Sequence, residues 1–331
     1  MRYLAALRYS HGELLAAEQC ARRGLRLAQR LRDSRAILFN LNLLGLSLWE
    51  RGAYAQSRRY LAQALRHAVA QGDELFRSIF TANLAMVEMA LGHHGEALAL
   101  YAEALLNERG RGALASAAET LNNMGIAQRA LGRLDEARES LEEARALCEQ
   151  HDLHAVRPSV LVNLGIVARD AGDPQGARRW LDRAVASERA EAGKLNAADP
   201  YLWLGVLDMD AGDLERAAAR LVDALAIVRE TDSPVIALNW LAVFARWCLR
   251  GGAVGDAAVA LSAAEAHGGL SALDREDALR GVDPCEILAL AAIRPAQPPA
   301  ESLPELLSWA RERLRRPPRG PRESARGRAG S

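Results

Sequence analysis

Apolar residues along most of the chain recur at intervals of three and four positions, the spacing that places them on one face of a helix. Between Asn122 and Ala144, one such stretch ends just before Gly132 and a second begins just after it. A glycine at this point suits a chain that leaves a helix through a left-handed backbone conformation. Asp135 and Glu136 then favour a new helix start, because negative charge is stabilised at the positive end of the helix dipole. The pattern predicts a helix, a tight turn and an antiparallel helix.

The same unit recurs every forty residues. Glycine stands at Gly12, Gly52, Gly92, Gly132, Gly172, Gly212 and Gly252. A small residue follows five positions after each glycine: Ala17, Ser57, Ala97, Ala137, Ala177, Ala217 and Ala257. Another small residue, alanine or glycine, lies seven positions before each of the seven repeat glycines, as Gly125 lies before Gly132. We expect these positions to let the two helices of a unit approach closely. No unit can bury its apolar face alone, so the units should stack.

The order of these residues resembles the tetratricopeptide-repeat pattern. Leu164-Gly165, Gly172, Ala177, Leu181 and Ala184 illustrate it in one unit. The resemblance covers residues 1–267 as seven repeats, and it implies an all-α, right-handed α-solenoid. The usual unit has 34 residues and a proline near its end. The forty-residue units here lack that proline and resemble the long repeats of kinesin light chains. They also resemble the repeats behind the ATPase domains of bacterial transcription regulators of the maltose-regulator and LuxR types.

A stack of this family resembles a superhelix whose first helices line a concave groove. On the expected inner face, asparagine recurs at Asn83, Asn123 and Asn163, again forty residues apart. An asparagine amide can donate to and accept from a peptide backbone at once. The three asparagines resemble those at the same position in related long repeats, where the resemblance implies a ladder of amides that holds an extended peptide. The alternative is that each asparagine caps or bridges neighbouring helices.

Charged and aromatic residues lie around these asparagines. Arg129 and Arg169 share one repeat position, and Arg246 lies on the same expected face, as does Trp49. Arginines there would suit an acidic or carboxylate-bearing peptide. Acidic residues occupy an adjoining position, so solvated ion pairs are the alternative. The predicted peptide-binding groove therefore comprises Asn83, Asn123, Asn163, Arg129, Arg169, Arg246 and Trp49.

The chain lacks the motifs of common catalytic centres. Its single lysine, Lys194, has neither the upstream glycines nor the following Ser or Thr of a phosphate-binding loop. The kinase lysine motif and a nucleophile elbow are also missing. His151 and His154 have a spacing that could hold a metal, yet no cysteine or third histidine is placed to complete a site. His93 and His94 fall in a turn. We predict no catalytic residue, no metal and no cofactor, and no enzyme activity.

The composition limits where in the cell the protein is expected and which kinds of partner it is expected to bind. Basic and acidic residues balance at 42 each, so the molecule is not built to attract nucleic acid. The four cysteines form no C-x-x-C pair, which fits a reducing cytoplasm. The N-terminus does not read as a signal peptide. No apolar run approaches the roughly 18 residues of a membrane span. We predict a cytoplasmic protein without a membrane partner.

The repeat pattern fails after Ala264. We predict that residues 268–316 form a helical capping segment and that residues 317–331 are disordered. Eight arginines between Arg311 and Arg328 could bind nucleic acid weakly, although a solvated tail is favoured. At the other end, the chain starts at about the fourth position of its first helix. We expect that this chain is the C-terminal part of a longer protein or that its true start codon lies further upstream. The DNA sequence upstream of the first codon tests this expectation.

Two function classes remain. The first is an interaction scaffold that binds a protein or peptide partner in the groove. The second is the sensor and oligomerisation arm of a bacterial signalling ATPase or transcription regulator, in which the chain would form homo-oligomers. The stretch "DAAVALSAAEAHG" resembles the ends of such arms. An upstream ATPase domain or a downstream helix-turn-helix domain in the gene would favour the second class.

Overall fold

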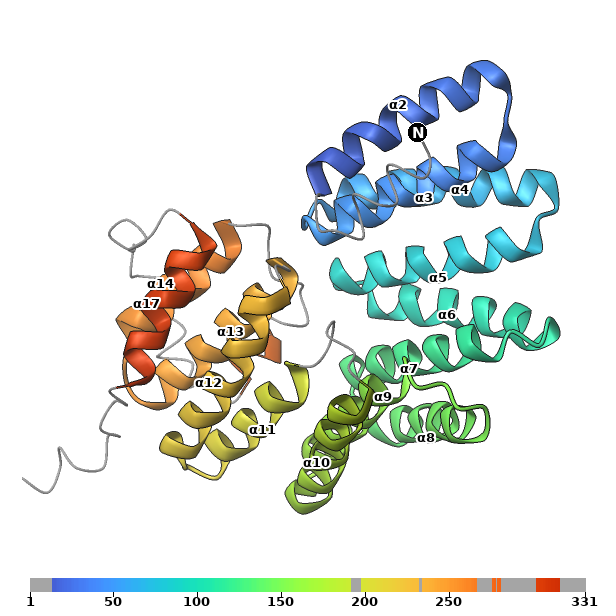
Figure 1. The fold of residues 1–331 in the computed structure, drawn as a ribbon. Coiled ribbons are helices and arrows are strands. Elements are labelled where there is room, and N and C mark those ends of the chain that lie inside the picture. The colour runs from blue at the N-terminus through green and yellow to red at the C-terminus, as the bar shows by residue number, and fades with distance from the viewer. Residues whose placement is uncertain are drawn as a thin grey trace, which may run out of the picture. The chain divides into compact units, whose positions relative to one another are not determined.

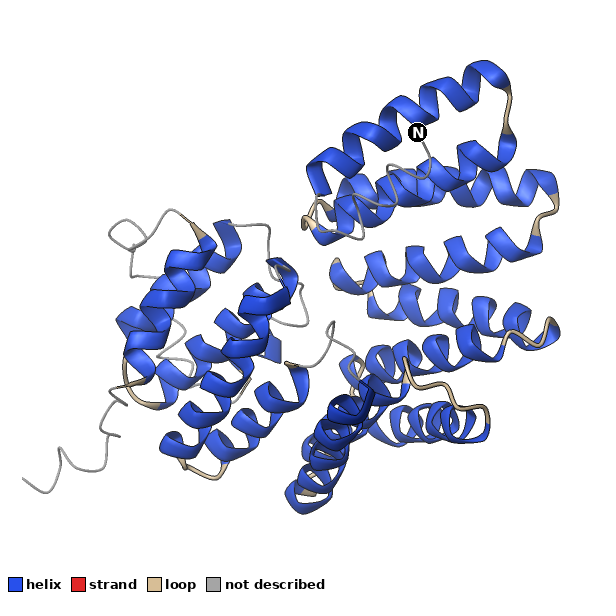
Figure 2. Ribbon diagram, viewed as in Figure 1, coloured by secondary structure: helices blue, strands red, loops and turns tan. Residues whose placement is uncertain are grey.

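The computed structural model describes residues 14–191, 198–231, 234–266, 276–277, 279–280 and 302–315. Over these ranges the chain forms fourteen helices and no strand, which confirms the predicted all-α class (Figure 2). The molecule divides into two units, residues 1–171 and residues 172–331. Each unit is described separately. None of the helices in the described ranges has the length and apolar character needed to span a membrane.

The first unit is a succession of antiparallel helix pairs, coloured blue to green in Figure 1. Each helix packs on the next in the chain. Four of them, α3, α5, α7 and α9, also pack on one another in that order, and we call these the inner helices. The helices are α2 (Leu14–Leu31), α3 (Ser34–Glu50), α4 (Tyr54–Gln71), α5 (Glu74–Ala90), α6 (His94–Gly110), α7 (Leu114–Ala130), α8 (Leu134–Gln150) and α9 (Arg157–Asp170).

The second unit continues the helix pairs around an aromatic core. Trp240 and Trp247 each stack on Phe244, and all three are buried. The last described helix packs on α12, α13 and α14, and it buries Leu306 and Leu307. The helices are α10 (Pro174–Glu191), α11 (Asp199–Asp210), α12 (Leu214–Thr231), α13 (Pro234–Arg250), α14 (Val254–Ala266) and α17 (Leu303–Leu314).

The predicted boundaries are only partly within the described residues. Helix α17 lies inside the predicted capping segment, residues 268–316. Most of that segment, the tail at 317–331 and the first repeat glycine, Gly12, lie outside the described residues. These boundaries therefore stay predictions.

The repeat glycines do form the turns. Six of them have positive φ: Gly52 (71°), Gly92 (83°), Gly132 (75°), Gly172 (82°), Gly212 (81°) and Gly252 (78°). At Gly132, the following Arg133 N–H donates to the Gln128 carbonyl at 2.9 Å, which satisfies a helix-end acceptor. The role predicted for these glycines is confirmed at all six described positions.

Close approach of paired helices is also confirmed. A Cβ atom on Gly125 would lie 2.6 Å from Cγ of Leu141 on α8, and a Cβ on Gly45 would lie 2.6 Å from Cγ of Leu61 on α4. Both leucines are fully buried. The absent side chain therefore lets each leucine pack directly on the facing helix.

We expect Gly132→Val to lower the free energy of unfolding by about 1–2 kcal/mol, the cost of left-handed backbone for a residue with a Cβ. No atom lies within 4 Å of the position of that Cβ, so the Cβ itself meets no neighbouring group and the positive φ is the main cost. Urea denaturation measures it. The control is Gly95→Ala in the first turn of α6, where the added Cβ also meets nothing and no positive φ is needed. This variant should be at least as stable as the parent, and equal destabilisation by both variants would refute the turn role.

Candidate peptide-binding face

Two of the predicted asparagines bridge neighbouring inner helices. Asn83 on α5 donates from Nδ2 to Oδ1 of Asn42 on α3 at 2.8 Å. Asn163 on α9 donates in the same way to Asn122 on α7 at 2.9 Å. The partners are 41 residues apart in both pairs. The structure thus shows the bridging alternative for Asn83 and Asn163. Each bonded amide keeps a second N–H and a carbonyl oxygen that can bond elsewhere.

Asn123 differs from the other two. It occupies the same repeat position on α7 and is half-buried. The residue 41 positions earlier is Ala82, whose methyl group can accept no hydrogen bond. In the described part of the chain, the Asn123 side chain has no hydrogen-bond partner. Both its donor and its acceptor are therefore available.

Partly exposed apolar side chains flank the asparagines on the same helix faces. Ile79 and Met86 lie one turn on either side of Asn83 on α5. Ile126 lies one turn after Asn123 on α7, and Leu46 lies one turn after Asn42 on α3. The exposed strip along the inner helices therefore contains amides and aliphatic groups, together with the carboxylate of Glu119, which is exposed one turn before Asn123 on α7.

The predicted arginines are already paired. Arg129 Nε lies 2.7 Å from Asp170 Oδ2, and Arg169 Nη1 lies 2.9 Å from Oδ1 of the same carboxylate. Their side chains are 5% and 11% exposed, and that of Asp170 is 5% exposed. The structure confirms that Arg129 and Arg169 form ion pairs. The expectation that these pairs are solvated is wrong, because they are buried. Packing of α7 against α9 encloses all three groups.

Arg246, in the second unit, is also buried and paired. It is 2% exposed, and its Nη2 lies 2.8 Å from Asp210 Oδ1. Its Nη1 donates to the Asp277 carbonyl at 2.8 Å. A partner-binding role for Arg129, Arg169 and Arg246 stays a prediction, since binding would require these contacts to rearrange.

Trp49 lies near the end of α3 and is partly exposed. Its indole N–H is buried and has no acceptor among the residues that the structure describes. A tryptophan N–H usually finds an acceptor when it is buried. A partner-binding role for Trp49 stays a prediction.

Sequence reasoning missed several polar residues. Asn42 and Asn122 are not among the predicted groove residues, although the step of 41 residues to the next inner helix would have paired them with Asn83 and Asn163. Glu108 was also missed. It is buried on α6, where the Ser78 hydroxyl of α5 donates to its Oε1 at 3.2 Å.

The histidines considered for metal binding include His154, whose Nδ1 lies 2.6 Å from Nη2 of Arg157.

Glu108 should make stability depend on pH. Burial raises the pKa of its carboxyl above the ordinary 4.5 and outweighs the hydrogen bonds from Thr120 and Ser78, which lower it. The folded state therefore binds the proton more tightly than the unfolded state. The resulting stability is complete below about pH 4.5 and is lost as pH rises through the folded-state pKa. We expect Glu108→Gln to remove this loss and to be the more stable protein at pH 7. Urea denaturation between pH 4 and pH 7 measures the difference, with the exposed Glu103→Gln on the same helix as the control.

Two family models match the sequence. The model described as tetratricopeptide repeat matches residues 77–150 and 116–190. A second model, described as anaphase-promoting complex subunit 5, matches residues 41–111 and 175–247. No curated protein matches the chain.

Several solved structures share the fold. BtubC (BKLC) from P. vanneervenii is 22% identical, with a TM-score of 0.53 over 66% of this chain and 92% of that one. Apo RapI is 14% identical, with a TM-score of 0.62 over 87% and 97%. NprR in complex with its cognate peptide NprX is 16% identical, with a TM-score of 0.56 over 68% and 64%. At these identities the likeness extends to the fold alone.

Proposed function

We propose, from the premise that this chain is a tetratricopeptide-repeat protein, that it binds an extended segment of a protein partner along its inner helices. NprR, a structural neighbour, is in complex with its cognate peptide, which supports a peptide or protein ligand for a fold of this kind. Cys20, Cys148 and Cys248 form no disulfide within the described part of the chain, which suits the cytoplasmic location proposed from the sequence. The proposed role is binding without catalysis.

The main observation in support of this proposal is the row of asparagines on the inner helices, Asn83, Asn123 and Asn163. An extended peptide exposes unpaired N–H and C=O groups along its length, and main-chain hydrogen bonds supply affinity in such complexes. Asn123 offers both a donor and an acceptor. Asn83 and Asn163 keep further capacity, and their bonds to Asn42 and Asn122 orient the amides before any partner arrives. Preorganised groups lose less entropy when they bind.

The chemistry of the strip favours apolar side chains in the partner. Ile79, Met86 and Ile126 are partly exposed beside the asparagines. The arginines that would have favoured an acidic partner are buried and already paired with Asp170 and Asp210. We therefore propose a segment with apolar side chains facing α5 and α7, in place of the acidic peptide that the sequence suggested.

Site-specific photocrosslinking tests the proposal. A photoreactive amino acid in place of Ile126, on the inner helix α7, should capture the partner in a native lysate. The same amino acid in place of Glu139, exposed on the adjacent α8, is the matched control and should not capture it. The partner peptide linked to position 126 is then identified by mass spectrometry. Capture from position 139 alone would contradict an inner-face site.

The regulatory arm proposed from the sequence would use the same surface. Gene neighbourhood distinguishes it, because an adjoining ATPase or helix-turn-helix domain is required. In that case the captured partner would include a second copy of this chain or the adjoining domain.

A further inference from the structure

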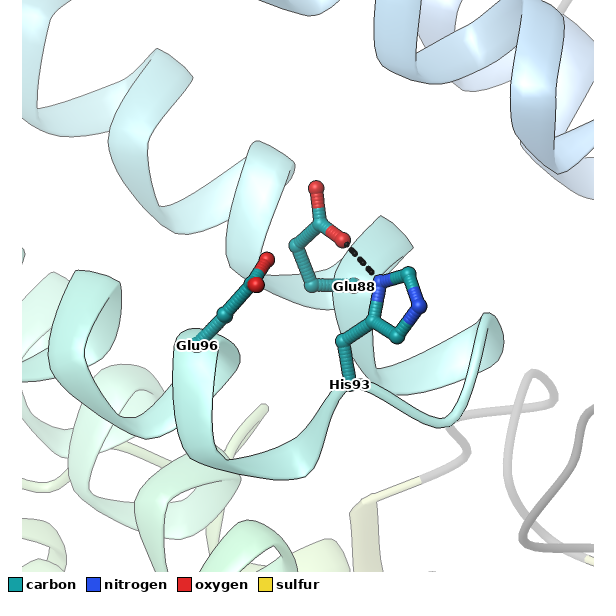
Figure 3. A group of neighbouring side chains, drawn as sticks. All are labelled: Glu88, His93 and Glu96. Atoms are coloured by element: carbon teal, nitrogen blue, oxygen red, sulfur yellow. Dashed lines mark hydrogen bonds and ion pairs between the residues drawn. The ribbon is translucent and has the colours of Figure 1, made fainter.

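Three side chains gather where α5 turns into α6, away from the asparagines. Glu88 lies in the last turn of α5, His93 precedes the first residue of α6, and Glu96 lies in the first turn of α6. The left-handed Gly92, with φ of 83°, folds the chain back between them. Figure 3 shows the Glu88 carboxylate between His93 and Glu96.

Their geometry approaches that of a metal site. One ligand atom from each residue lies within 4.8 Å of the other two, and His93 Nδ1 is 2.7 Å from Glu88 Oε2. Zinc binds nitrogen and oxygen ligands at about 2.0–2.2 Å, so two ligands of one ion lie within about 4.4 Å of each other. Side-chain rotations are enough to close the difference. Glu88 is a buried anchor, whereas the side chains of His93 and Glu96 are 47% and 66% exposed and can turn inward.

Arg58 on α4 is the charge that could oppose a cation here. Its Nε lies 2.6 Å from Glu88 Oε1, which leaves Oε2 directed at His93. Carboxylates that bind metals are commonly held by such an outer hydrogen bond. Its Nη2 is 3.9 Å from Glu96, a weaker contact that a metal can replace. Two carboxylates against one guanidinium leave the cluster with net negative charge when the imidazole is neutral, which attracts a divalent cation.

We propose that Glu88, His93 and Glu96 bind a divalent transition-metal ion, with Zn²⁺ as the best match. Imidazole with carboxylates is a common zinc ligand set, and three protein ligands leave a position for water or another ligand. The ion ties the end of α5 to the start of α6. It therefore stabilises one repeat at its turn, independently of the partner site.

Calorimetric titration of the full chain with Zn²⁺ tests the site. We expect one equivalent to bind through these residues and excess Zn²⁺ to raise the melting temperature, because an ion that binds only the folded state stabilises it. His93→Gln and Glu96→Gln should each weaken binding at least about tenfold, since even outer partners of a metal site contribute that much. Both side chains are well exposed, so the variants should fold.

The matched control is His151→Gln, an exposed histidine elsewhere in the first unit, which should bind Zn²⁺ like the parent. Glu88→Gln breaks the pair with Arg58, so its fold is checked by circular dichroism before titration. Absence of binding by the parent, or unchanged affinity in both His93→Gln and Glu96→Gln, would overturn the proposal. Equal loss in His151→Gln would do so as well.

Discussion

Replacing Asp170 by alanine should lower the free energy of unfolding by about 3–5 kcal/mol, the range for removing one partner of a buried ion pair. Its side chain is 5% exposed and accepts from Arg129 at 2.7 Å and from Arg169 at 2.9 Å. Without the carboxylate, two guanidinium groups stay enclosed between α7 and α9 with less compensation. The effect should be local, because stability in a repeat array is close to a sum of repeat and interface contributions.

Urea denaturation measures the size of this loss, and hydrogen exchange shows whether it centres on α7 and α9. The matched control is Asp135→Ala, which breaks an exposed pair with Arg138 at 3.4 Å. Exposed pairs contribute little and a carboxylate in the first turn of a helix adds about 0.3–1 kcal/mol, so this variant should lose at most about 1 kcal/mol, well below the loss in Asp170→Ala. If Asp170→Ala were as stable as Asp135→Ala, the enclosed pair would not hold the two inner helices together.

Replacing Asn83, Asn123 and Asn163 together by alanine should weaken partner binding about 100-fold. Each lost hydrogen bond is worth roughly 1 kcal/mol, and three such bonds amount to about two powers of ten in affinity. The fold should change only modestly, because the three side chains are half-buried and only two helix-bridging bonds are lost. Calorimetry with the captured partner peptide measures the affinity, and circular dichroism checks the fold.

Asn107→Ala supplies the control for this variant. Asn107 lies on α6 and donates to Glu74 at 2.6 Å, away from the asparagine positions. Its replacement should leave affinity unchanged. The single variant Asn123→Ala removes an amide without breaking a bridge, so it separates peptide binding from helix bridging. Unchanged affinity in both the triple and the single variant would refute a role for these asparagines.

Features that depend on local backbone geometry could be predicted from the sequence. A glycine between two helical stretches predicted a left-handed turn, and Gly132 has φ of 75°. A small residue facing a leucine predicted close packing, and Gly125 leaves room for Leu141. Both follow from the absence of a Cβ, a property of the residue itself.

Features that depend on how consecutive repeats pack could not be predicted from it. The forty-residue step aligned Asn83, Asn123 and Asn163, but the contacts between inner helices follow a step of 41 residues. That offset pairs Asn83 with Asn42, and it encloses Arg129 beside Asp170. The cluster at Glu88 spans one predicted turn, but whether its three side chains converge depends on their rotamers, which the sequence does not determine.

Hydroxyl-radical footprinting of the complex tests the central claim most directly, because it reports which side chains a bound partner covers. Met86 and Ile126, partly exposed on the inner helices, should become protected when the partner binds. Leu106, 76% exposed on α6, should react equally in the free and bound protein. Protection of Leu106 with unchanged reactivity at Met86 and Ile126 would contradict binding along the inner helices.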